Sequence, residues 1–200
     1  MAGESYLIAG LGNIGPEYAL TRHNMGFMVL DAWAKASNIS FETRRYGDLA
    51  VLDIKGRHFY LLKPSTYMNL SGEAIRYWLS KLPVPQERLM VVCDDINLPF
   101  GTLRMRSRGS DGGHNGLKNI EECIGSQDWA RIRMGVGHDF GEGRQIDYVL
   151  SPLEPSQTEQ IPGLCEKVIA GVQDWAFAGI ERAMNNFNTR ATFAPTNASM

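Results

Sequence analysis

GLGNIG, residues 10–15, follows a short apolar stretch near the start of the chain, and TRHN, residues 21–24, begins six residues after it. A glycine loop of this kind is typical of dinucleotide-binding folds, in which a helix opens inside the turn and faces a pyrophosphate. Here Pro16 follows the third glycine, and an apolar helical pattern resumes only near residues 21–25. The chain therefore makes a wide loop that brings His23 and two asparagines to the end of the first strand, which favours hydrolysis over cofactor binding.

The composition is that of a globular protein with one sizeable core: 200 residues, of which 44% are hydrophobic and 21% charged. The net charge of −2 gives no global signature of nucleic-acid binding, so a site for a polyanion must be a local basic patch. Three cysteines at unrelated spacings argue against both a disulfide framework and a zinc site. No apolar run approaches the roughly 20 residues of a membrane helix, and no leader is recognisable, so we expect a cytoplasmic protein.

Predicted strands and helices alternate along the chain. Strands are expected at residues 6–9, 49–54, 58–62, 89–93, 102–108 and 131–136, and helices at 25–37, 71–81, 114–124 and along an apolar face at 164–176, with Ser71 as a helix cap. This order predicts an α/β fold: a single three-layer α/β/α domain over residues 1–184, with a mixed, largely parallel central sheet. The polar residues 185–200 predict a flexible C-terminal tail.

Polar residues follow several of these strands, where ligands of open α/β sheets bind. The set expected at this rim is Asn13, His23, Asn69, Asp94, Asp95, His114 and Asn115. A neutral histidine can take a proton from water, a carboxylate on its other nitrogen fixes the tautomer, and asparagine amides can hold a substrate or a developing oxyanion.

No nucleophile stands out among the side chains near this rim. The chain has no Gly-x-Ser-x-Gly elbow, and Cys93 ends an apolar strand, where inert packing is the simpler interpretation. Its four histidines lack the close spacings of metal-binding motifs, so we expect neither a metal nor a cofactor. Water is therefore the expected attacking group.

At this point the sequence resembles a known family, the bacterial-type peptidyl-tRNA hydrolases, over about residues 6–150. The resemblance rests on several segments in order: GLGN at 10–13, Tyr18, TRHNMG at 21–26, KPSTYMNLSG at 63–72, DDINLPFG at 94–101 and GGHNGLK at 112–118. Ile14 and Asn97 depart from the family's usual proline and acid, and neither departure removes a required side chain.

The resemblance implies hydrolysis of the ester between a peptide, or an N-blocked aminoacyl group, and the 3′ ribose of tRNA. It implies that His23 activates a water with support from Asp94, and that Asn13, Asn69 and Asn115 contact the substrate. The further substrate-binding positions that it implies are Tyr18, Tyr67, Met68, His114, Arg106 and Arg133. It implies that the enzyme serves translation by releasing tRNA for reuse and rescuing stalled ribosomes, and we expect a monomer with no membrane partner.

A basic surface for RNA is expected on two strands. Arg104, Arg106 and Arg108 alternate along one, and Arg131 and Arg133 along the other, so each set points to one face. Two other interpretations remain open: a catalytically silent RNA-binding relative that acts in RNA processing, and a dinucleotide-dependent enzyme built on residues 10–15.

Overall fold

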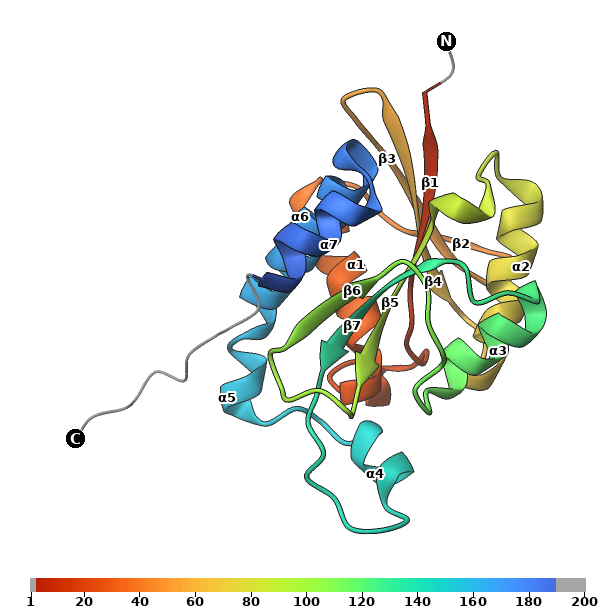
Figure 1. The fold of residues 1–200 in the computed structure, drawn as a ribbon. Helices are drawn as coiled ribbons and strands as arrows, with labels where there is room; N and C mark the ends of the chain where they lie inside the picture. The colour runs from red at the N-terminus through yellow and green to blue at the C-terminus, as the bar shows by residue number, and fades with distance from the viewer. Residues whose placement is uncertain (1–2, 190–200) are drawn as a thin grey trace.

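The computed structural model describes residues 3–189, which form a seven-stranded sheet flanked by helices on both faces (Figure 1). The strand order is β2-β3-β4-β1-β5-β7-β6. Neighbours among β4, β1, β5 and β7 run parallel, whereas β2, β3 and β6 join the sheet in antiparallel pairs. The strands are β1 (Ser5–Gly10), β2 (Glu42–Arg44), β3 (Gly47–Ile54), β4 (Arg57–Pro64), β5 (Leu89–Asp95), β6 (Leu103–Arg106) and β7 (Ala130–Gly135). The prediction of a mixed, largely parallel sheet is confirmed.

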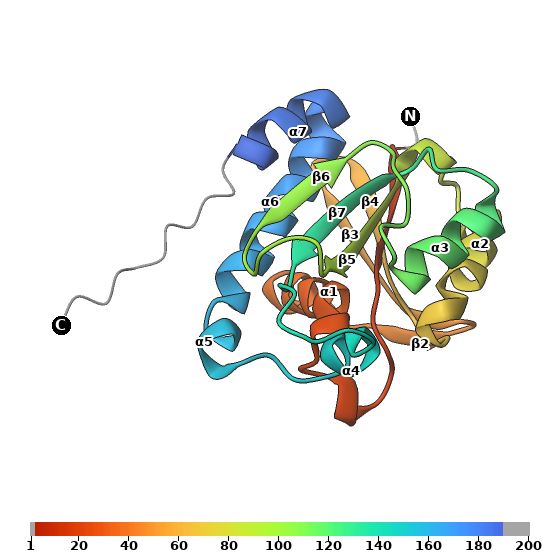
Figure 2. The ribbon, with the colours of Figure 1, turned by 60° about the horizontal axis from the view of Figure 1, so that its bottom comes forward.

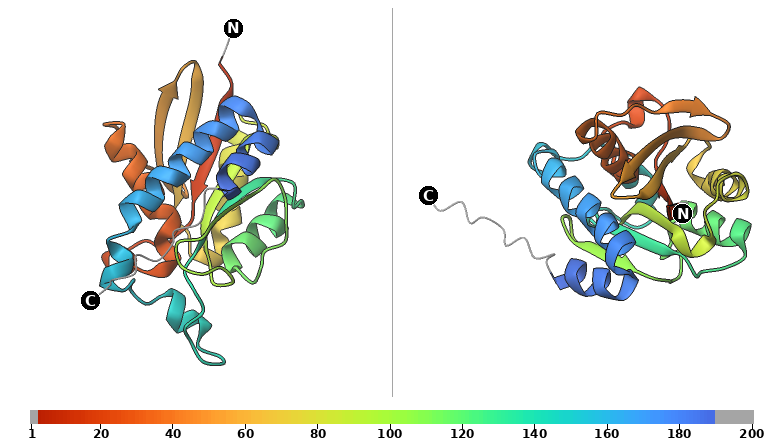
Figure 3. Two further views of the ribbon diagram at one scale, coloured as in Figure 1. Left: turned by 60° about the vertical axis from the view of Figure 1, so that its left-hand side comes forward. Right: turned by 90° about the horizontal axis from the view of Figure 1, so that it is seen from above.

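Two helical layers complete the predicted three-layer fold, as the turned views show (Figures 2 and 3). One layer contains α1 (Met25–Ala36), α6 (Ile161–Ala178) and α7 (Ile180–Thr189), and the other contains α2 (Ser71–Lys81) and α3 (Asn115–Ile124). The short helices α4 (Gln145–Val149) and α5 (Pro155–Thr158) link β7 to α6, and α4 lies beside the carboxyl ends of the central strands. No helix within residues 3–189 is long and apolar enough to cross a membrane.

Each helical layer covers its own apolar core, which explains the near-continuous burial of the central strands. Trp33 of α1 and Trp175 of α6 belong to the cluster on one face of the sheet, together with Phe59 of β4. Ile75 of α2 and Leu117 of α3 belong to the cluster on the other face. Strands β1 and β5 are buried along their full length, so the residues at their carboxyl ends have well-fixed positions.

The glycines of the first loop serve close packing between β1 and α1. A Cβ at Gly10 would lie 2.3 Å from the carbonyl oxygen of Gly26, and a Cβ at Gly12 would lie 2.6 Å from the ring of Phe27. After Gly15 the chain forms two short 3₁₀ turns, Pro16–Tyr18 and Arg22–Asn24, and α1 does not begin until Met25. The loop therefore lacks the helix N-terminus on which a pyrophosphate would sit, as its sequence predicts.

Two local predictions are wrong. Residues 185–189 belong to α7 rather than to a flexible tail: Phe187 is buried, and Asn188 accepts a hydrogen bond from Met105 N and donates one to Met105 O. The rest of the predicted tail, residues 190–200, lies outside the described part of the chain. Ser71 does not cap α2, because the 3₁₀ turn Met68–Leu70 continues directly into the helix and Met68 O accepts the Ser71 N–H.

Candidate active site

A pocket of about 210 Å³ lies at the carboxyl ends of β1, β5 and β7. The residues that line it come from seven parts of the chain: Asn13, His23, Met68 and Asn69, Asp94 to Ile96, Gly112 to Asn115, Arg133, and Gln145, Ile146, Val149 and Leu150. Eight of the eleven residues that the sequence analysis assigned to catalysis or substrate binding therefore share one pocket: Asn13, His23, Met68, Asn69, Asp94, His114, Asn115 and Arg133.

Three of the assigned residues lie outside the wall of this pocket. Tyr18 is half-buried in the first loop, Tyr67 is 78% exposed beside the pocket residue Met68, and Arg106 lies on β6 near the edge of the sheet. Any contact that they make with a substrate must therefore be with parts of it that extend beyond the pocket.

His23 lies in a short segment that the C-terminal part of the domain holds in place. The neighbouring Arg22 is buried and donates hydrogen bonds to Ser151 Oγ at 2.6 Å and to Pro152 O at 2.7 Å. Its guanidinium also lies 4.3 Å from the centroid of the Tyr148 ring. No pattern in the sequence predicts this role for Arg22, because its partners are about 130 residues away along the chain.

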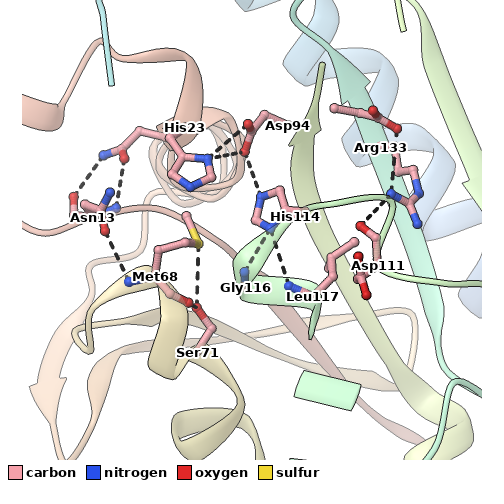
Figure 4. Close-up of polar contacts among 12 residues, drawn as sticks. Asn13, His23, Met68, Ser71, Asp94, Asp111, His114, Gly116, Leu117 and Arg133 are labelled. Carbon is pink, nitrogen blue, oxygen red and sulfur yellow. Dashed lines mark hydrogen bonds and ion pairs between the residues drawn. The ribbon is translucent and has the colours of Figure 1, made fainter. Parts of the chain in front are cut away.

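A hydrogen-bonded chain of three buried side chains forms the floor of the pocket (Figure 4). His23 Nδ1 lies 2.9 and 3.0 Å from the two carboxylate oxygens of Asp94, and His114 Nε2 lies 2.9 Å from Oδ1 of the same carboxylate. Asp94 is the penultimate residue of β5, and His114 directly precedes α3, so the sheet and the helix fix the arrangement from two sides.

The start of α3 determines which nitrogen of His114 carries the proton. Its Nδ1 accepts hydrogen bonds from Gly116 N at 3.1 Å and Leu117 N at 3.4 Å, and so caps the helix. The proton must then be on Nε2, which donates to Asp94. Because an ionised carboxylate accepts from both rings, His23 carries its own proton on Nδ1 and keeps the lone pair of Nε2 for the pocket.

The charges of this cluster shift both pKa values in the direction that hydrolysis needs. Burial raises the pKa of Asp94, but His23 and His114 lower it by more, so the pKa lies well below its usual range and the carboxylate stays ionised. Burial lowers the pKa of His23, but the charge and hydrogen bonding of Asp94 outweigh it and raise the pKa above the ordinary value of 6.5. His23 is thus a stronger base than a free imidazole.

The same three side chains are the candidate metal ligands among residues 3–189, since their ligand atoms lie within 4.8 Å of one another. Their hydrogen bonds fit this role poorly. A metal on His114 Nε2 would displace the proton that is directed at Asp94, while Nδ1 is occupied at the start of α3. The donor set therefore fits a proton-transfer site better than a cation site.

Asn13 is held at the pocket by a residue that the sequence analysis did not assign to the site. The buried side chain of Asn24 accepts a hydrogen bond from Asn13 N at 2.8 Å and donates one to Asn13 O at 2.9 Å. Asn13 Oδ1 accepts a hydrogen bond from Met68 N at 3.3 Å, which leaves its amino group as the donor available to a ligand. Asn24 belongs to the TRHN segment, but only the fold shows that its side chain positions Asn13.

Arg133 lines the pocket, whereas its strand neighbour Arg131 does not. Arg133 lies 3.7 Å from Asp95 and donates to the carbonyl of Ser110 in the glycine loop. Arg131 is buried, stacks 3.5 Å over Trp129, and donates to carbonyls including Gly109 O at 2.7 Å. The prediction that Arg131 contributes to an open basic surface is therefore wrong, because alternation along a strand fixes the face of a side chain and not its depth.

The other basic residues of this expected surface differ in their availability. Arg104 and Arg106 are exposed on β6, directly opposite Arg133 and Arg131. Arg108 lies beyond the end of β6 and pairs with Asp128 at 3.2 Å. Arg104 and Arg106 are thus the predicted cations that remain open for an anionic partner.

Cys93, the alternative nucleophile, is fully buried in β5, and burial raises the pKa of its thiol far above the ordinary value. Ser71 is also buried, and it donates to Met68 O at 2.7 Å. Neither side chain lines the pocket, so neither is placed to attack a substrate there.

Comparison with known proteins identifies the family. The peptidyl-tRNA hydrolase family model matches residues 7–195. The chain is 53% identical to a peptidyl-tRNA hydrolase of Phocaeicola vulgatus over 188 residues and 52% identical to one of Bacteroides fragilis over 185 residues, each match covering 92% of this chain and 99% of the relative. A peptidyl-tRNA hydrolase of Acinetobacter baumannii superimposes with a TM-score of 0.86 at 30% identity, covering 94% of this chain and 96% of that chain. The resemblance of its motifs is confirmed, and the chain belongs to the peptidyl-tRNA hydrolase family.

Proposed function

We propose that this pocket hydrolyses the ester that joins a peptide, or an N-blocked aminoacyl group, to the 3′ ribose of tRNA. The observation that carries the proposal is the chain from His114 through Asp94 to His23, which leaves one histidine nitrogen free to act as a base in the pocket. Family membership supplies the substrate class. The products are free tRNA and a free peptide, so the enzyme returns tRNA to translation, and we place it in the cytoplasm as a monomer.

His23 activates the attacking water. Its Nε2 takes a proton from the water as the oxygen attacks the ester carbonyl, and Asp94 stabilises the imidazolium that forms. The tetrahedral intermediate then expels the 3′ oxygen of the ribose, which receives the proton back from His23. The asparagine amides of Asn13, Asn69 and Asn115 hold the peptide and the developing oxyanion without adding charge to the pocket.

The first test is the release of the acyl group from N-acetyl-aminoacyl-tRNA in the presence of EDTA. Rapid release that is insensitive to the chelator supports a metal-free hydrolase. If the protein binds tRNA tightly but releases no acyl group, the silent RNA-binding alternative is correct. Saturable binding of NAD at micromolar concentration would instead support a dinucleotide-dependent enzyme, although the position of α1 argues against it.

The raised pKa of His23 predicts the pH profile. Because the base must be neutral, kcat/KM should rise with pH along an acidic limb whose midpoint lies above the ordinary histidine value of 6.5. Asp94→Asn removes the charge that raises this pKa and leaves the burial that lowers it, so the midpoint should move to lower pH even as the rate falls. Rates measured from about pH 5 to 8 check this expectation. A midpoint that is the same in both proteins would contradict it.

Arg106 is proposed to contact a phosphate of the tRNA. Arg106→Ala should raise KM several-fold with little change in kcat, and should reduce the slope of log(1/KM) against log[salt] by about 0.7–0.9, the value expected for one lost phosphate contact. Arg44→Ala is a matched control, because Arg44 is also exposed but pairs with Glu42 on β2, at the opposite edge of the sheet. A slope that Arg106→Ala leaves unchanged would exclude Arg106 from the RNA site.

A further inference from the structure

A cluster of aromatic and cationic side chains lies on the turn between β2 and β3 and on the adjacent helix α2. We call it the aromatic–cation patch, and it consists of Arg45, Tyr46, Tyr77, Trp78 and Lys81. The Tyr77 ring meets Tyr46 and Trp78 edge to face, with centroids 5.2 and 5.3 Å apart. The Arg45 guanidinium lies 5.0 and 5.3 Å from the Tyr46 and Tyr77 rings, and the Lys81 ammonium lies 5.7 Å from that of Tyr77.

The two cations of the patch differ from their neighbours. Arg44 and Arg76 each form an ion pair, with Glu42 and Glu73. Within residues 3–189, neither Arg45 nor Lys81 has a carboxylate within ion-pair distance. Their charges lie over aromatic rings and remain available to an anionic or aromatic partner.

The patch is held in a fixed geometry. Trp78 Nε1 donates a hydrogen bond to Arg45 O at 3.0 Å, which ties the turn to α2. Tyr46 has a φ of 64°, a left-handed conformation that is uncommon for a residue other than glycine. The chain thus places an aromatic ring, 38% exposed, where glycine would be the less strained choice.

The patch is connected to the catalytic pocket through one short segment. Tyr46 O accepts a hydrogen bond from Ser65 N at 2.9 Å, and Met68, three residues further along, lines the pocket. Three residues span at most about 11 Å. Tyr67, which lies between Ser65 and Met68 in the sequence, is 78% exposed.

The route from the pocket to the patch suits the peptide part of the substrate rather than the tRNA. Strand β2 lies at one edge of the sheet and β6 at the other (Figure 2). The residues that line the catalytic pocket include the ends of the central strands β5 and β7, which lie between these edges. Under the proposed function, tRNA approaches on the side of Arg106 and Arg133. The peptide leaves the ester in the opposite direction, past Met68 and Tyr67.

We propose that the aromatic–cation patch is a second substrate site, which binds the peptide roughly three to six residues before the ester. It favours acidic and aromatic side chains, because Arg45 and Lys81 attract carboxylates and the rings of Tyr46 and Tyr77 pack against other rings. This inference rests on the proposed function and assigns to it a preference for peptide sequence and length.

The test compares three substrates that carry the same tRNA and the same residue at the ester. One is N-acetyl-aminoacyl-tRNA; the other two carry N-acetylated hexapeptides, one with Asp and Phe and one with Lys at the upstream positions. For the wild-type protein, kcat/KM should be about tenfold higher for the Asp/Phe substrate than for the Lys substrate, the combined effect of two exposed contacts of this kind. The difference should lie mainly in KM.

Two variants test the patch directly. Arg45→Ala removes a fully exposed cation, and Tyr46→Gly removes the ring while relieving the left-handed conformation, so neither is expected to impair folding. Both should reduce the preference for the Asp/Phe substrate to within about twofold, and both should cleave N-acetyl-aminoacyl-tRNA at the wild-type rate. Arg76 lies on α2, next to Tyr77 in the sequence, and is exposed but paired with Glu73. The Arg76→Ala variant is therefore the control and should keep the full preference.

Either of two results would overturn the proposal. The first is a wild-type protein that does not distinguish the two hexapeptides. The second is variants that weaken all three substrates, and deacylated tRNA, to the same extent, because the patch would then contact RNA. Failure of the proposed function itself would appear differently, as a wild-type protein that cleaves none of the three.

Calorimetric titration with the two free hexapeptides then tests the patch without catalysis. Stronger binding of the Asp/Phe peptide, lost in Arg45→Ala, supports the proposal, and equal binding of the two peptides contradicts it.

Discussion

His23→Ala is expected to reduce kcat by about 10²–10⁴-fold, the usual contribution of a positioned general base. The two other members of the buried chain cannot replace it. The Nε2 proton of His114 is directed at Asp94 and its Nδ1 caps α3, so this ring has no free lone pair, and the carboxylate of Asp94 is fully buried behind the two rings. The measurement is single-turnover cleavage of N-acetyl-aminoacyl-tRNA.

The folding of this variant and its binding of tRNA should be preserved. The His23 side chain is hydrogen-bonded through Nδ1 alone, while Arg22 and Asn24 on either side hold the segment through their own contacts. An unchanged dissociation constant for deacylated tRNA, measured on the same preparation, would separate a chemical defect from a structural one. Activity within about tenfold of wild type would mean that His23 is not the base.

Asp94→Asn should lower kcat by about 10²-fold, less than the loss of His23 and without a comparable change in KM. The change keeps the size of the side chain but replaces one carboxylate oxygen with an NH₂ group. His114 can only donate to this side chain, so the amide must turn its remaining oxygen towards His114. The new NH₂ group then lies about where Oδ2 is now, 3.0 Å from His23 Nδ1.

His23 Nδ1 also lies 2.9 Å from the oxygen that the amide keeps, but the NH₂ group beside it opposes a proton on Nδ1. The substitution therefore favours the other tautomer of His23, with its lone pair towards residue 94 and its proton towards the pocket. The base would then be misdirected rather than absent. His114→Ala in the Asp94→Asn background removes the group that fixes the amide orientation and should therefore recover part of the lost rate. If the double variant is slower than Asp94→Asn by the full cost of His114→Ala alone, the tautomer argument is wrong.

The sequence could predict the pocket because the residues that line it lie at the ends of strands and in the loops that follow them. Asp94 ends a continuous apolar run, and Asn13 follows another, so the parallel arrangement of these strands places the two residues at one edge. His114 was expected near them, but its two hydrogen-bonding roles depend on how the glycine loop before α3 folds. Gly112 and Gly113 adopt left-handed conformations there, and a sequence pattern does not specify this path.

The sequence could not predict which residues are buried or which distant segments contact one another. Arg131 and Arg133 have the same pattern and lie two residues apart, yet Trp129 and the carbonyl of Gly109 enclose the first and leave the second at the pocket. Helix α4, with Gln145 and Ile146 in the pocket wall, is only five residues long and too short for a periodic signal. Tertiary packing decides both cases.

The proposed catalysis depends on one property above all, the free Nε2 lone pair of His23 beside an ionised Asp94. This property can be measured directly by ¹⁵N NMR of the histidine rings across a pH titration. We predict that neutral His23 carries its proton on Nδ1 and titrates above the ordinary value of 6.5. A neutral ring protonated on Nε2 would contradict it, because the lone pair would then point at Asp94 and no base would face the substrate.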